Sequence, residues 1–125
     1  MIDTFLVDMR SKIIKYQIKQ RNYKRPFMQF VKKAHKPLKL AIEDAVDLVC
    51  DNPDIGEAKV GDLAGIRVYK FRFNRRQYLL AYRPPAQETT FEFLVIDFYQ
   101  VGTHENFYEA LKRYLRQESN RGETL

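Results

Sequence analysis

The chain has 125 residues, enough for one domain and too few for two. Apolar residues make up 45% and charged residues 30%, which is typical of a globular protein with a modest core, and no apolar run approaches the roughly 20 residues of a membrane span. The net charge of +6 attracts polyanions and acidic protein partners, and the single cysteine, Cys50, excludes an intramolecular disulfide and a zinc site, so a cytoplasmic protein is expected.

The first half of the chain predicts a strand followed by a helical hairpin. Residues 13–19 alternate between apolar and polar side chains, which predicts a strand. Residues 22–34 carry apolar side chains at i, i+3, i+4 and i+7, which predicts a helix, and a second helical stripe follows Pro37. Asn52 and Pro53 are expected to end that second helix, because proline disfavours the helical conformation in the residue before it.

The second half predicts three strands and a last helix. The apolar period changes from 3.6 to 2, and strands are expected over residues 68–73, 78–83 and 89–99. A helix is expected from about residue 103 to residue 117, with Thr103 as its N-cap.

The resulting order, β-α-α-β-β-β-α, predicts an α+β fold. Short turns between successive strands favour a small antiparallel sheet, with the helices expected on one of its faces. We expect residues 12–118 to form the domain, residues 1–11 an N-terminal appendage and residues 119–125 a flexible tail. In the appendage, Phe5 and Met9 are compatible with a short helix that packs on the domain and equally with a frayed end.

Four segments, in the correct order, resemble the RelE/ParE superfamily of toxins from bacterial toxin–antitoxin pairs. They are Tyr16–Gln20 with the hairpin that ends at Asp51–Gly56, then Lys59–Phe71, then Leu79–Tyr82, then Gly102–Tyr108. The resemblance covers roughly residues 12 to 116. It implies the fold predicted above and a cognate antitoxin that neutralises the toxin by wrapping it.

The resemblance leaves the target open. RelE-type members cleave mRNA in the ribosomal A site, whereas ParE-type members poison DNA gyrase without cutting RNA. We expect a ribosome-dependent mRNA endonuclease that arrests translation and growth. The alternatives are a gyrase inhibitor without nuclease activity and a degenerate toxin fold with only an interaction role. No metal or organic cofactor is expected, because the chain has no metal-ligand cluster and no phosphate-binding glycine loop.

Metal-free RNA cleavage needs a base, an acid and cations around the phosphorane. His104 is the candidate base: in the first turn of the last helix, the positive helix end would favour a neutral imidazole. In RelE-like nucleases with a Gly-Thr-His motif the matching histidine is catalytic. The alternative is that His104 only fixes the start of the helix. Tyr108, four residues on, is expected on the same helix face, either stacking on an RNA base or packing beside Phe107.

The candidate phosphate-binding residues are basic. Lys70 and Arg72 lie two apart on one strand face, and the resemblance implies that they contact phosphate; the alternative is an ordinary solvated face. Further candidate guanidinium groups belong to Arg75, Arg76 and Arg83.

Two further positions bear on the mechanism. Many RelE-like nucleases carry an arginine where this chain has Leu79, which weakens a strict transfer of their mechanism. Asp97 has three possible roles: orienting His104, pairing with Arg72, or lying at the exposed end of the sheet.

The antitoxin is expected to bind through an acidic helical segment. That segment would cover the basic strand face or displace the last helix, whose apolar stripe a partner helix can imitate.

Overall fold

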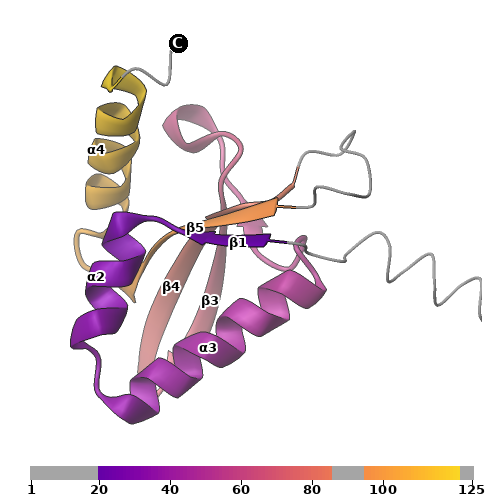
Figure 1. Cartoon of the computed structure of the whole chain (residues 1–125), viewed down its shortest axis with the longest axis vertical. Helices are drawn as coiled ribbons and strands as arrows, with labels where there is room; N and C mark the ends of the chain where they lie inside the picture. Colours follow the sequence, from indigo (N-terminus) through magenta and orange to yellow (C-terminus); the bar gives the residue numbers. More distant parts are fainter. Residues whose placement is uncertain (1–19, 86–94, 122–125) are drawn as a thin grey trace, which may run out of the picture.

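The computed structural model describes residues 20–85 and 95–121, and it confirms the predicted α+β class and element order (Figure 1). The elements are β1 (Gln20–Tyr23), α2 (Arg25–Lys33), α3 (Lys36–Asp51), β2 (Glu57–Ala58), the 3-10 turn η1 (Gly61–Leu63), β3 (Arg67–Phe73), β4 (Arg76–Arg83), β5 (Val95–Thr103) and α4 (Phe107–Asn120). No helix within the described ranges is long and apolar enough to cross a membrane.

The five strands form one mixed sheet in the order β1-β5-β4-β3-β2. The predicted antiparallel pairing is confirmed for β3, β4 and β5, and the short strand β2 adds to the outer edge of β3. β1 pairs with β5 in parallel. This parallel pair is possible because the α2–α3 hairpin and the strands that follow it lie between β1 and β5 in the chain.

The start of the described chain differs from the prediction. Residues 22 and 23 were expected to be helical, yet they belong to β1 and pair with Asp97 and Phe98. The helix α2 begins only at Arg25, and Pro26 lies in its first turn, where the fixed φ of proline favours a helix start. The strand predicted over residues 13–19 lies outside the described residues.

The sheet buries apolar side chains on both faces, because successive strand residues point to opposite sides. On one face, Leu80, Tyr82 and Phe98 pack against α2 and α3. On the other face, Leu79 and Ala81 of the sheet pack against Phe107 and Leu111 of α4. The prediction that the helices would share one face is therefore wrong. Figure 1 shows α4 at the end of α2 and well away from α3.

Two buried side chains of this scaffold, Tyr82 and Cys50, have raised pKa values. The Tyr82 hydroxyl donates to the Pro53 carbonyl at 2.7 Å and accepts from the Gly56 amide at 2.9 Å, so it fixes the loop after α3. Burial raises the pKa of Tyr82 to about 12. Cys50 is buried in α3, and burial raises the pKa of its thiol to about 11.

Candidate functional site

Lys70 and Arg72 lie on β3, both exposed, on the face of the sheet that α4 partly covers. Lys70 pairs with Leu79 across the β3–β4 ladder, and Leu79 is fully buried beneath α4. Phe71, which lies between the two cations, points to the opposite face together with Tyr69 and Phe73. Val68, Lys70 and Arg72 therefore share one face of β3. Val68 is buried at one end of this row, and the two cations are exposed to solvent.

The turn after β3 presents a third cation. Asn74 and Arg75 form a two-residue connection in which both have positive φ, 55° and 69°. This is the type I′ geometry that fits the twist of a β-hairpin. The Arg72 guanidinium donates to the Arg75 carbonyl at 3.3 Å, which keeps Arg72 close to the turn. Arginine is an unfavourable residue for the left-handed region, so Arg75 is placed there at an energetic cost.

The two remaining predicted arginines, Arg76 and Arg83, do not lie with Lys70, Arg72 and Arg75. Arg76 pairs with Phe73 and shares its face, the one that α2 and α3 cover. Arg83 lies at the far end of β4, where its Nε donates to the Tyr99 hydroxyl at 3.4 Å and its guanidinium lies over the Tyr99 ring. Arg83 lies four residues along β4 from Leu79, the ladder partner of Lys70. At the rise of a β-strand this is about 14 Å, so Arg83 is far from the basic pair.

His104 lies in the loop between β5 and α4, so its predicted place in the first helical turn is wrong. Thr103, the predicted N-cap, is the last residue of β5 and pairs with Tyr78. The helix begins at Phe107, whose amide donates to the His104 carbonyl at 3.1 Å, and Asn106 precedes it with a left-handed φ of 57°. The strand is longer than expected because its last residues still find partners on β4.

The His104 side chain is exposed and contacts Tyr108, with the ring centroids 5.9 Å apart. Tyr108 is half-buried and packs beside Phe107, which is buried in the core. The His104–Tyr108 pair stands just past the Tyr78–Thr103 pair of the β4–β5 ladder. Arg72 pairs with Gln77 at the same end of the sheet. Two strand spacings, about 10 Å, separate β3 from β5.

Lys59 joins this group and was not predicted. Its ammonium lies 5.2 Å from the centroid of the Tyr108 ring and donates to Glu57 at 3.2 Å. Partial burial by itself lowers the pKa of Lys59, but its hydrogen bonds to Glu57 and Tyr108 outweigh this effect and raise the pKa. The loop between β2 and η1 carries Lys59 onto the α4 side, and only the three-dimensional fold brings the two together.

Asp97 plays none of the roles that involve His104 or Arg72. It accepts a hydrogen bond from the Asn22 amide at 2.9 Å, and it pairs with Arg83 across the β4–β5 ladder. Six residues of β5, Phe98–Thr103, lie between Asp97 and His104. The carboxylate therefore ties β1 to β5 at the opposite end of the sheet.

The described residues thus place an imidazole, a phenol and an ammonium in one group, with two further cations on the same sheet face. Such a group can accept a proton, donate a proton and bind a phosphate.

A family model described as "ParE-like toxin of type II bacterial toxin-antitoxin system" matches residues 22–112, well over half of the chain. Comparisons with curated proteins and with solved structures give no match. The matched range contains the whole site, from Lys59 to Tyr108. The chain therefore belongs to the ParE-like toxins of type II toxin–antitoxin systems, within the RelE/ParE superfamily.

Proposed function

We propose that this toxin cleaves mRNA on the ribosome and thereby arrests translation. The observation that carries the proposal is the contact of the exposed His104 with Tyr108, beside Lys59. A gyrase-binding surface has no need of a general base. An exposed imidazole next to a phenol and an ammonium supplies the groups that metal-free RNA cleavage requires.

In the proposed reaction His104 accepts the proton of the ribose 2′-hydroxyl. The 2′-oxygen then bonds to phosphorus, and the bond from phosphorus to the 5′-oxygen breaks. The Tyr108 hydroxyl donates a proton to the leaving 5′-oxygen, and the neighbouring Lys59 ammonium stabilises the phenolate that forms. Lys70 and Arg72 bind the phosphates of the bound strand, with Arg75 as a further contact from the turn.

Two observations favour the alternative, inhibition of DNA gyrase. The matched family is described as ParE-like. In addition, the position at which many RelE-like nucleases carry an arginine is Leu79, which is fully buried in the core under α4. No guanidinium can stand there without disrupting the packing of that helix.

The two functions are separated by inducing the toxin without its antitoxin and assaying RNA and DNA in parallel. Cleavage predicts new mRNA 5′ ends inside codons, detected by primer extension. Gyrase inhibition predicts linearised plasmid when purified toxin meets gyrase. Growth arrest without new 5′ ends would refute the nuclease proposal.

Variants of the two histidines make the test specific to the site. His104→Ala is expected to reduce RNA cleavage by about 10²- to 10⁴-fold, the usual effect of losing a general base. His35→Ala is the matched control, because His35 is exposed in the turn between α2 and α3 and its ring contacts Phe73 on the other sheet face. Full toxicity of a folded His104→Ala protein would favour gyrase inhibition.

Lys70→Ala tests the phosphate contact against Lys36→Ala, an exposed lysine at the start of α3. The loss of one phosphate contact should weaken binding at all sequences and reduce its salt dependence. Equal effects of the two substitutions would mean that only net charge matters.

A cognate antitoxin is implied by the family. We propose that an acidic antitoxin segment covers Lys70 and Arg72, since opposite charges across an interface favour association. Antitoxin binding should then weaken with salt and protect both side chains from chemical modification. Salt-independent binding that leaves both accessible would refute this part of the proposal.

A further inference from the structure

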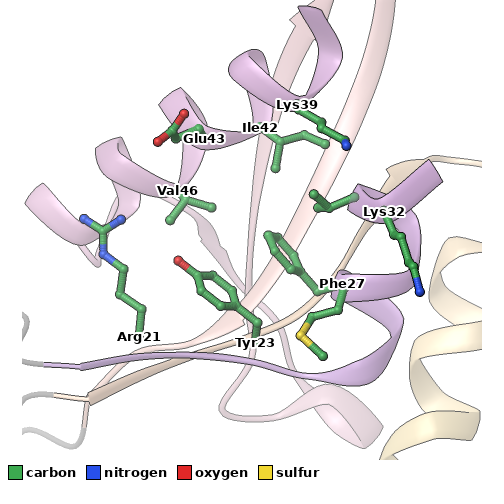
Figure 2. A pocket seen from close by; sticks show the side chains of 10 residues that line it. Arg21, Tyr23, Phe27, Lys32, Lys39, Ile42, Glu43 and Val46 are labelled. Atoms are coloured by element: carbon green, nitrogen blue, oxygen red, sulfur yellow. The ribbon is translucent and has the colours of Figure 1, made fainter. Parts of the chain in front are cut away.

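A groove opens between β1, α2 and α3, on the opposite side of the sheet from His104. It has a volume of about 420 Å³, and Figure 2 shows α3 along one side and β1 with α2 along the other. Its floor is apolar and buried, formed by Phe27, Ile42 and Val46. Its walls expose further apolar surface: Tyr23 is 38% exposed and Met28 52%. Exposed apolar surface arranged in this way favours an apolar occupant.

The rim of the groove is mainly basic. Lys32 of α2 and Lys39 of α3 lie toward one end of the groove, Arg21 lies toward the other, and Glu43 lies on the α3 side (Figure 2). Arg21 forms an ion pair with Asp47 at 2.9 Å. Neither lysine has an ion-pair partner among the residues that the structure describes. The groove therefore fits an apolar helix face that is flanked by carboxylates.

The segment of chain that precedes β1 has this character. Ile2, Phe5, Leu6 and Met9 fall at i, i+3, i+4 and i+7, which is one face of a helix. At 100° per residue, Asp3 and Asp8 flank that face on its two sides.

The segment is also connected at the right place. β1 begins at Gln20, and two of its residues, Arg21 and Tyr23, line the groove. The ten residues from 10 to 19 can span up to about 33 Å, so the connection is long enough for residues 2–9 to turn back onto the groove.

We propose that residues 2–9 of this chain dock as an amphipathic helix in the groove between β1, α2 and α3. The apolar face covers the floor, and Asp3 and Asp8 approach Lys32 and Lys39. A tethered segment has a high effective concentration at its own groove, so modest intrinsic affinity suffices for occupancy. Any partner helix that uses this groove must first displace the segment. The inference does not depend on the chemistry proposed for His104.

Thiol labelling of the full-length chain tests the proposal. Met28→Cys places a reporter thiol on the groove wall, in a Cys50→Ala background that removes the native thiol. A neutral maleimide is used so that added charge has little effect on the reagent. Docking predicts slow labelling that becomes at least about tenfold faster when Leu6→Asp and Met9→Asp are introduced together, because burying two carboxylates on an apolar floor is strongly unfavourable.

The matched control adds two aspartates to the opposite side of the proposed helix, as Thr4→Asp with Val7→Asp. It should leave the Met28→Cys thiol protected. A second reporter is Val60→Cys, at a position in the loop after β2 where Val60 is 84% exposed. This thiol should react at the same rate in every variant, and an unchanged rate would exclude a global change in folding.

Equal labelling of Met28→Cys in the parent and in the Leu6→Asp, Met9→Asp variant would overturn the proposal. Protection that grows with protein concentration would also overturn it, because the occupant would then be a second copy of the chain. Protection that is independent of concentration and lost only in the apolar-face variant is the result expected.

Discussion

The substitution Tyr82→Phe isolates the contribution of one buried hydroxyl to the stability of the fold. Tyr82 has no exposed surface, and its hydroxyl makes two hydrogen bonds, to the Pro53 carbonyl and from the Gly56 amide. Phenylalanine keeps the ring and leaves both backbone groups buried without this partner. Each such group costs about 1 to 3 kcal/mol, so we expect the two together to lower the free energy of unfolding by about 2 to 6 kcal/mol. That is a large part of the total stability of a domain of this size, about 5 to 15 kcal/mol.

Urea denaturation followed by circular dichroism measures the change. The midpoint should fall while the slope with denaturant stays constant, since the surface exposed on unfolding is nearly the same. Tyr78→Phe is the matched control. It removes a hydroxyl from the same strand and the same sheet face, but no hydrogen bond from this hydroxyl is found within the described part of the chain. We expect it to cost less than about 1 kcal/mol. Equal losses in the two variants would refute the reasoning, because the hydrogen bonds of Tyr82 would then not matter.

Three further predictions concern the same scaffold. Gly56→Ala should destabilise the protein by about 1 to 3 kcal/mol in urea denaturation, because the added Cβ would lie 2.8 Å from the Tyr82 hydroxyl and 2.9 Å from the Val68 carbonyl carbon. Arg75→Gly should raise the unfolding free energy by about 1 kcal/mol, since glycine adopts a φ of 69° without strain, and should still weaken RNA binding if Arg75 contacts phosphate; unchanged stability would contradict the assigned turn. Burial raises the pKa of Tyr82 from 10.0 to about 12, so the unfolded chain loses this proton first and stability should fall as the pH rises from 10 to 12; Tyr82→Phe should flatten that part of the pH profile.

The order of elements could be predicted because each signal was local. The change of apolar period after residue 56 separates the helical hairpin from the strands, and the alternation along β3 correctly separates its aromatic face from its basic face. The alternation could not show that part of the basic face is buried in a second hydrophobic core. Val68 and Leu79 are buried there because α4 lies over them, and the position of α4 depends on contacts far apart in sequence.

The boundaries of the last helix were wrong for a related reason. Thr103 has the side chain of a good N-cap, but its backbone pairs with Tyr78, and a ladder partner outweighs local capping preference. Similarly, Asn22 and Tyr23 were assigned to a helix, whereas their partners, Asp97 and Phe98, are more than seventy residues away. Lys59 was overlooked because nothing in its neighbourhood of the sequence marks it; only folding brings it to Tyr108.

The site and the packing of α4 are physically coupled. His104 lies three residues before Phe107, the first residue of α4, and Tyr108 is the second residue of that helix, so the contact between them exists only while the helix is seated. Phe107 and Leu111 seat it on the sheet.

Two polar contacts hold the helix at its two ends. The buried Gln100 amide donates to the Phe107 carbonyl at 2.8 Å, and Lys24 forms a partly buried ion pair with Glu118 at 2.9 Å. The ion pair also raises the pKa of Lys24 against the opposing effect of burial. A partner that lifted α4 would have to break both contacts. It would also separate Tyr108 from Lys59, so displacement of this helix would dismantle the site without touching Lys70 or Arg72.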